Sequence, residues 1–188
     1  MTDSTRPFGT WAKIYRDLGL SPRPLKYPGA DSRTGKLLGK ACKERGWQLP
    51  DSELPPGTVE KWDAQYGHYN IGLLMGTPLP DGTLLGALDI DHDQYVPLGR
   101  ALLGNPSCGR VGKKGAVYFV RFTPLEAKVK YKVKGEQNAA FGQVAEFLLQ
   151  RTLCVIPPSI HPDIEQPYRW IGTPLHEMDF NQLPLIGE

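Results

Sequence analysis

The chain has 188 residues, 40% of them apolar, and a formal net charge of +2. This length suits one domain with a real core, and the small net charge means that any nucleic-acid-binding surface must be local. Three widely spaced cysteines (Cys42, Cys108 and Cys154) form no CxxC pair, which argues against a disulfide framework or a structural zinc site. No apolar run approaches the ~20 residues that a membrane span needs, and the N-terminus lacks a secretory h-region. We therefore expect a cytoplasmic protein without a membrane partner.

The first part of the sequence predicts two helices around a long loop. Apolar side chains recur at helical spacing over residues 6–18, which predicts an N-terminal helix. Residues 21–57 are rich in Pro, Gly, Lys and Arg and are expected to be irregular. A second helix is predicted over residues 58–66, with Thr58 as its N-cap and Trp62 facing the core.

The remainder is predicted to be mainly β-structure. Alternating patterns and β-branched or aromatic runs predict strands at 71–75, 84–91, 116–122, 128–134, 143–149 and 152–156. One helix is expected between them, over residues 94–103. Pro157 and Pro158 end the last strand, and the tail after Trp170 is expected to be extended. The pattern predicts an α+β fold whose strands share one antiparallel sheet.

The motif Leu-Asp-Ile-Asp at residues 88–91 is the sharpest chemical signal. Because successive side chains of a strand point to opposite faces, Asp89 and Asp91 share one face, with Cα atoms roughly 6–7 Å apart. Two such carboxylates can converge on one or two hard cations, as in two-metal phosphoryl-transfer sites. A strand end that runs into an acidic, solvated loop is the alternative.

A third acid, Glu146, lies within an otherwise apolar predicted strand. A carboxylate among core positions usually has a partner. If this strand neighbours the strand of Asp89 and Asp91, the three carboxylates form a cluster. Otherwise Glu146 faces water from an edge strand.

Two further segments carry residues suited to phosphate binding. The loop that starts at Arg110 contains two glycines beside Lys113 and Lys114, so its backbone and cations can approach phosphates closely, although it lacks the P-loop spacing. Prolines fix the backbone around Ser159 and His161, whose side chains can bind phosphate oxygens. A solvated basic turn and a capped loop histidine are the alternatives.

A row of lysines alternates with apolar residues along the predicted strand at 128–134. Such a row usually forms a solvated sheet face. Its spacing also suits the phosphates of a DNA strand, whose contacts give affinity without sequence reading. The row consists of Lys128, Lys130, Lys132 and Lys134.

Taken in order, these pieces resemble the prim-pol family, the bifunctional primase/polymerase domain of the archaeo-eukaryotic primase superfamily in phage, plasmid and prophage replication proteins. The resemblance covers roughly residues 40–170, and we expect residues 1–188 to form a single domain. It rests on Trp47, Trp62, Asn70-Ile-Gly72, Leu88-Asp-Ile-Asp91, the Gly-Lys-Lys-Gly loop, Glu146, Ile156-Pro-Pro-Ser-Ile-His-Pro162 and Tyr168-Arg-Trp170.

The resemblance implies an RRM-like antiparallel sheet that carries the acids, packed with a smaller α/β unit. It also implies template-directed nucleotidyl transfer, by a DNA primase or DNA polymerase that uses two Mg²⁺ or Mn²⁺ ions. Asp89, Asp91 and Glu146 would be the catalytic metal-binding acids, Ser159 and His161 would lie near the triphosphate, and the basic loop would contact phosphates. The partners would be a dNTP or NTP, a single-stranded or primed DNA template and a helicase domain or protein. We expect a monomer.

One departure from the family pattern concerns its second motif. Many members have Ser-x-His or Gly-x-His where this chain reads Lys-Gly-Ala-Val-Tyr, at residues 114–118. Either Lys114 takes over phosphate binding, or His161 is the sole histidine that serves it, or the protein is impaired. The alternative function is therefore a degenerate module that binds DNA or nucleotide, or recruits a helicase, without catalysis. A metal-dependent nuclease is a further alternative, because it also uses clustered carboxylates.

Overall fold

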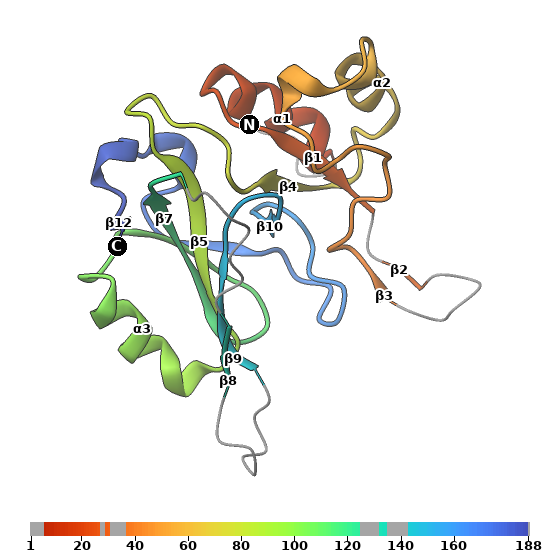
Figure 1. Cartoon of the computed structure of the whole chain (residues 1–188). Coiled ribbons are helices and arrows are strands. Elements are labelled where there is room, and N and C mark those ends of the chain that lie inside the picture. Colours follow the sequence, from red (N-terminus) through yellow and green to blue (C-terminus); the bar gives the residue numbers. More distant parts are fainter. Residues whose placement is uncertain (1–5, 27–28, 31–36, 125–131, 135–142, 188) are drawn as a thin grey trace.

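The computed structural model describes residues 6–26, 29–30, 37–124, 132–134 and 143–187. In this part of the chain, the strands are mainly antiparallel and form a seven-stranded sheet, a three-stranded sheet and a two-stranded ribbon, and helices pack beside them (Figure 1). The predicted α+β class is confirmed, whereas the prediction of a single sheet is wrong. The ribbon consists of β2 (Gly29–Ala30) and β3 (Leu37–Leu38).

The three-stranded sheet has the order β1–β4–β10, with β1 at Pro22–Leu25, β4 at Asn70–Leu74 and β10 at Leu153–Val155. β1 lies in the segment that was predicted to be irregular, because Pro22 and Pro24 hide the strand signal. A proline cannot donate to a sheet ladder, but it is tolerated in an edge strand such as this one. The helix α1 (Pro7–Asp17) packs on β1 and β4 and contacts α2 (Thr58–Gln65).

The seven-stranded sheet has the order β11–β6–β7–β5–β9–β8, and β12 pairs in parallel with β7. In this order its strands are Arg169–Gly172, Cys108–Val111, Ala116–Phe122, Leu84–Ile90, Gln143–Leu148 and Lys132–Lys134, with β12 at Leu185–Ile186. The predicted strands β5, β7 and β9 are confirmed. β6, β11 and β12 were missed, because strands of two to four residues show little periodicity.

The main core lies between the two larger sheets. Leu73 of β4 and Leu85 of β5 are fully buried in it, and α2 adds Trp62. On the opposite face of the seven-stranded sheet, α3 (Val96–Leu102) covers Leu88. The central strand β5 is therefore buried on both faces along most of its length.

Element ends differ from the predictions at several places. The N-cap of α2 is Gly57, with φ +79°, rather than Thr58, and the Gly57 carbonyl accepts the N–H of Lys61. The C-terminal segment is not simply extended, since it contains two short 3-10 helices (Leu175–Glu177 and Phe180–Gln182) before β12. Two more 3-10 helices lie at Asp51–Glu53 and Asp93–Tyr95. No helix among the described residues is long and apolar enough to cross a membrane.

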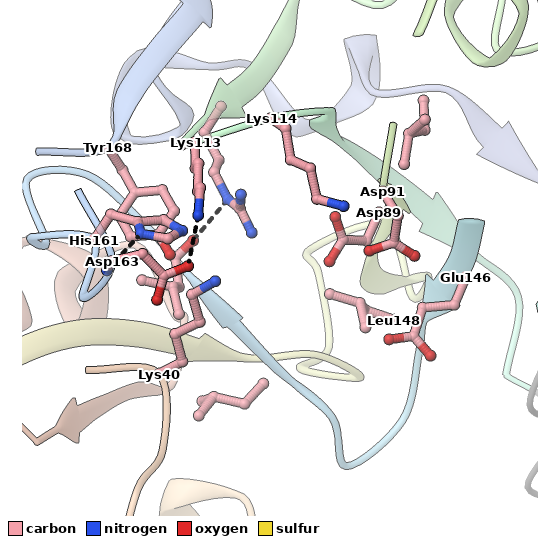
Figure 2. Close-up of a pocket in the computed structure, with 15 residues that line it drawn as sticks. Lys40, Asp89, Asp91, Lys113, Lys114, Glu146, Leu148, His161, Asp163 and Tyr168 are labelled. Atoms are coloured by element: carbon pink, nitrogen blue, oxygen red, sulfur yellow. Dashed lines mark hydrogen bonds and ion pairs between the residues drawn. The ribbon is translucent and has the colours of Figure 1, made fainter. Parts of the chain in front are cut away.

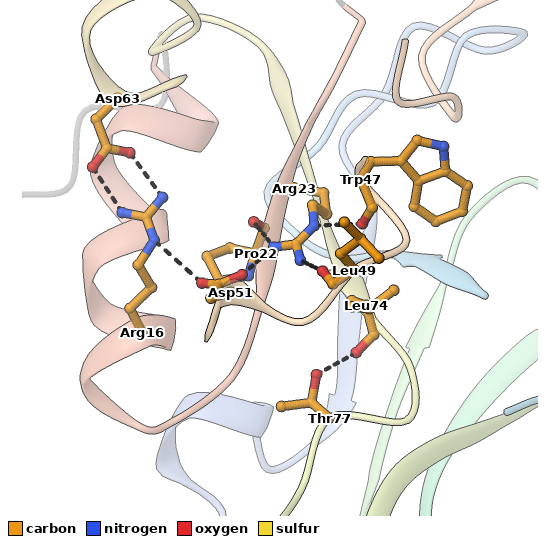
Figure 3. A network of polar contacts seen from close by, with 9 residues as sticks. All are labelled: Arg16, Pro22, Arg23, Trp47, Leu49, Asp51, Asp63, Leu74 and Thr77. Atoms are coloured by element: carbon orange, nitrogen blue, oxygen red, sulfur yellow. Dashed lines mark hydrogen bonds and ion pairs between the residues drawn. The ribbon is translucent and has the colours of Figure 1, made fainter. Parts of the chain in front are cut away.

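A fully buried arginine, Arg23 of β1, holds the loop at residues 47–51 against the three-stranded sheet (Figure 3). Its Nε donates to the Trp47 carbonyl at 2.7 Å, and its Nη atoms donate to the Pro22 and Leu49 carbonyls and to Asp51. Burial lowers the pKa of Arg23 and the Asp51 carboxylate opposes this effect. Only a planar fork of five donors can satisfy so many acceptors at once.

Replacing this arginine should destabilise the fold strongly. We expect Arg23→Met to lower the free energy of unfolding by about 3–5 kcal/mol, because it leaves buried backbone carbonyls unpaired and removes the closer of the two arginine partners of Asp51, the other being Arg16. Urea denaturation followed by circular dichroism measures this. Lys13→Met is the control, since the Lys13–Asp17 pair is exposed and should be worth about 0.5 kcal/mol or less. Equal losses in the two variants would contradict the prediction.

Candidate functional site

The strand register brings two of the predicted acids together. Asp89 of β5 pairs with Glu146 of β9 on one side and with Val117 of β7 on the other, and Val117 pairs in turn with Arg110 of β6. Directly paired residues of antiparallel strands point to the same face. Arg110, Asp89 and Glu146 therefore lie in one row on one face of the sheet, which resolves the alternatives that the sequence left for Glu146.

On this face of β5, apolar residues give way to acids toward the C-terminal end of the strand. Leu85 is buried in the main core, Asp89 follows at the edge of that core, and Asp91 lies just beyond the strand. Leu88 and Ile90 belong to the separate cluster under α3, so the side chains alternate as predicted. The N–H of Asp91 still donates to the backbone of β9, which keeps its carboxylate beside that of Asp89.

The acids open onto a pocket of about 280 Å³ whose opposite wall is mainly basic (Figure 2). That wall is built by three segments: the loop after β3, the end of β6 with the turn that follows it, and the segment that follows β10. The residues they contribute are Lys40, Arg110, Lys113, Lys114, His161, Asp163 and Tyr168. The pocket thus faces carboxylates on one side and cations on the other.

The environment of Asp89 disfavours its charged form. Burial is the largest effect and raises the pKa of this carboxyl, and the carboxylates of Asp91 and Glu146 raise it further. Arg110 and Lys40 act in the opposite direction. A cation bound between the acids would relieve this unfavourable charge.

The donor set of the acidic wall fits a hard divalent cation. Asp89, Asp91 and Glu146 supply only carboxylate oxygens, the ligands that Mg²⁺ and Mn²⁺ prefer. Figure 2 shows the three side chains at one side of the pocket, with Asp89 and Glu146 on neighbouring strands and Asp91 just after the first of them. Among the described residues, however, no three Asp, Glu, His or Cys side chains are arranged to hold an ion together. Joint coordination by these acids therefore requires their side chains to adjust.

The hydrogen bonds of His161 define it as a donor toward the pocket. Its Nδ1 accepts the backbone N–H of Asp163 at 3.1 Å, so the neutral ring carries its proton on Nε2. Burial, followed by the charge of Lys40, lowers the pKa of this imidazole, and the Asp163 carboxylate opposes them. A neutral imidazole with an Nε2–H is suited to donate to a phosphate oxygen.

The cations of the basic wall are held to different degrees. Arg110 is fixed on two sides, because its Nε donates to the Val155 carbonyl at 3.1 Å and its guanidinium lies over the Tyr168 ring, 4.9 Å from the centroid. Lys113 forms a half-exposed ion pair with Asp163 at 3.4 Å, which a ligand can displace at little cost. Lys114 extends toward the acids (Figure 2).

Ser159 does not line the pocket, contrary to the prediction. Its fully buried hydroxyl donates to the Ile71 carbonyl and accepts the Ile71 N–H, both at 2.8 Å. It therefore joins the segment after β10 to β4 and presents His161 from a fixed backbone. The sequence could not show that the Ser159 hydroxyl is hydrogen-bonded to the backbone of Ile71 in β4.

The predicted DNA-binding lysines are described only in part. Lys128 and Lys130 lie outside the described residues, and for Lys132 and Lys134 the structure describes only the backbone of β8. In that backbone, Lys132 pairs with Glu146. The edge strand β8, which contains Lys132 and Lys134, is thus adjacent to the strand of the third acid.

Three polar or charged residues that line the pocket were not predicted as site residues: Lys40, Asp163 and Tyr168. Lys40 belongs to a segment without periodicity, and the only signal for a site there was that the segment is rich in lysine and arginine. Partial burial and the nearby Arg110 lower the pKa of Lys40, which indicates that it faces other cations across the pocket. Asp163 lies two residues after the predicted His161 and carries no motif of its own, and Tyr168 belonged to the Tyr168-Arg-Trp170 match but had been given no role.

Comparison with models of protein families gives a match over most of the chain. The sequence model of a family described as bifunctional DNA primase/polymerase, N-terminal, matches residues 16–185, and this range includes every residue that lines the pocket. No curated protein matches the chain significantly.

The raised pKa of Asp89 predicts that removing its charge stabilises the fold. We expect Asp89→Asn to raise the free energy of unfolding at pH 7 by about 1 kcal/mol, a typical gain at a strained functional site. Because the folded-state pKa lies above the unfolded value of about 3.9, the penalty is complete above the folded pKa and vanishes below the unfolded one. The gap between variant and wild type should therefore shrink from pH 7 to pH 4.

Urea denaturation without divalent ions, repeated across this pH range, measures the gap. Glu60→Gln is the control, since Glu60 is exposed, lies outside the pocket and sits in the first turn of α2, where a negative charge is favourable, so this variant should gain no stability at pH 7. An Asp89→Asn protein that is less stable than the wild type at pH 7 would contradict the electrostatic account.

Proposed function

The chain belongs to the family of bifunctional DNA primase/polymerase N-terminal domains, and on this premise we propose that it catalyses template-directed nucleotidyl transfer with two divalent metal ions. The observation that carries the proposal is the pairing of Asp89 with Glu146 opposite a basic wall in one pocket. The acids suit metal ions and the basic wall suits a triphosphate. The proposed setting is replication of a phage, plasmid or prophage.

In this mechanism Asp89, Asp91 and Glu146 would hold Mg²⁺ or Mn²⁺. The chemistry that two bound ions supply is activation of the primer 3′-hydroxyl and neutralisation of charge at the reacting phosphate. The protein contributes the position of the acids, which the pairing of β5 with β9 fixes, and a partly buried setting that strengthens their charge interactions. The RRM-like character of the sheet stays part of this proposal.

The basic wall would bind the triphosphate and stabilise the leaving pyrophosphate. Arg110 is preorganised by Val155 and Tyr168, and His161 donates through Nε2–H, so neither must be ordered when nucleotide binds. Lys114 extends toward the acids, which supports its taking the place of the histidine that the second motif lacks. Ser159 would act only indirectly, through the backbone that presents His161.

We assign DNA contact to the edge of the sheet at β8, with Lys128, Lys130, Lys132 and Lys134 as candidate phosphate ligands. The pairing of β8 with β9 supports this assignment, since it puts the edge one strand from Glu146. Strand spacing is about 4.8 Å, so DNA that follows this edge passes close to the acids. A helicase domain or protein is a proposed partner.

Primer extension tests the central assignment. Wild-type protein with Mg²⁺ or Mn²⁺ should extend a short primed template, and Asp89→Ala/Asp91→Ala should lower kcat/KM at least about 10³-fold, because several kcal/mol of transition-state charge stabilisation is lost. Glu60→Gln should retain full activity. Undiminished extension by a well-folded double variant would refute the assignment of the metals to these acids.

The degenerate module stays the second candidate, because the second-motif histidine is missing and the acids of the described residues form no ready-made ion site. It predicts dNTP or DNA binding by a wild-type protein that does not extend primers. A nuclease would instead degrade the template in the presence of metal. It has no need of a triphosphate site and should not bind dNTP tightly.

A further inference from the structure

The acidic motif contains a third alternating carboxylate, Asp93, that the proposed mechanism does not use. The run Asp-Ile-Asp-His-Asp would place Asp89, Asp91 and Asp93 on one face if the strand continued. The strand β5 ends at Ile90 instead, and Asp93 begins the 3-10 helix Asp93–Tyr95. Asp93 does not line the pocket that the other two acids line.

The carboxylate of Asp93 instead binds the turn between β6 and β7. Its Oδ1 accepts the backbone N–H of Gly115 at 2.7 Å. Gly115 is buried, so this bond satisfies a donor that has little access to water. The contact therefore joins the segment just after the acids to the turn that carries the basic residues.

The turn lies very close to the end of β5 at this point. Gly115 has φ +64°, and a Cβ atom there would stand 1.8 Å from the Ile90 carbonyl oxygen. Any other residue would be strained by the positive φ angle, and its Cβ atom would collide with the Ile90 carbonyl oxygen. Lys113 and Lys114 directly precede Gly115, so the position of Gly115 determines where both lysine side chains start relative to Asp89 and Asp91.

We propose that Asp93 is a positioning residue: it holds the turn at residues 112–115 against the end of β5, as a latch, and so places Lys113 in the basic wall and Lys114 toward the acids. It is not a metal ligand. The effect on catalysis rests on the proposed function, whereas the latch itself is a property of the fold. A loosened turn weakens nucleotide binding because its lysines must be ordered when the triphosphate arrives.

The test compares Asp93→Ala with Asp93→Asn. Alanine removes the acceptor, so we expect the KM for dNTP to rise about fivefold, the value of one partly exposed hydrogen bond, while kcat changes less than twofold. Asparagine keeps an acceptor oxygen for Gly115 but is a poor metal ligand, so it should restore the wild-type KM. Asp89→Asn should instead abolish kcat.

A second readout does not depend on activity. Amide hydrogen exchange of Gly115, measured by NMR without metal or nucleotide, should accelerate in Asp93→Ala and return to the wild-type rate in Asp93→Asn. Asp179→Ala is the matched control, because its carboxylate also accepts a backbone N–H, from Asn181 at 3.0 Å, far along the chain. It should change neither the KM nor the exchange of Gly115.

Each outcome decides the proposal. An Asp93→Asn protein as inactive as Asp89→Asn would make Asp93 a metal ligand, and unchanged Gly115 exchange in Asp93→Ala would show that there is no latch. If wild-type protein does not extend primers, the proposed function fails separately. The exchange rates, together with the affinity for a fluorescent dNTP in place of KM, then still test the latch.

Discussion

The antiparallel pairing of β5 with β7 and β9 is the constraint on which the site depends. This register sets Asp89 opposite Glu146 on one side and, through Val117, in line with Arg110 on the other. Because the pairing has a period of two residues, a slip of one residue would turn both acids of the motif toward the face under α3. The apolar residues that bury β5 on both faces hold this register, and they therefore also determine which face of the sheet Asp89 and Asp91 point to.

The pocket keeps opposite charges apart without letting them neutralise each other fully. Asp89 is held where burial opposes its ionisation, and Lys40 where partial burial and other cations oppose its own. Neither arrangement favours folding, and such costs are expected where function requires unpaired charge. Much of the molecule's stability comes from elsewhere, from the core between the sheets. A ligand with divalent cations and phosphates complements both walls of the pocket.

The sequence predicted what local patterns encode and missed what tertiary context decides. Alternation identified β5 and placed Asp89 and Asp91 on one face, and the apolar surroundings of Glu146 indicated a partnered acid. No local signal could reveal β1, whose prolines are tolerated only at a sheet edge. Nor could the sequence show that β10 pairs with β4 in a separate sheet and not with the strands of the larger one. The surroundings of Ser159 could not be predicted for a similar reason, since its hydroxyl is hydrogen-bonded to a strand 88 residues away.

The most direct test of the central claim is a crystal structure with Mn²⁺ and a non-hydrolysable dNTP, with the metal located by anomalous scattering. The account predicts anomalous peaks within about 2.0–2.3 Å of carboxylate oxygens of Asp89, Asp91 and Glu146, with the triphosphate against Arg110 and His161. Nucleotide bound elsewhere, or bound in this pocket without metal at the acids, would contradict it.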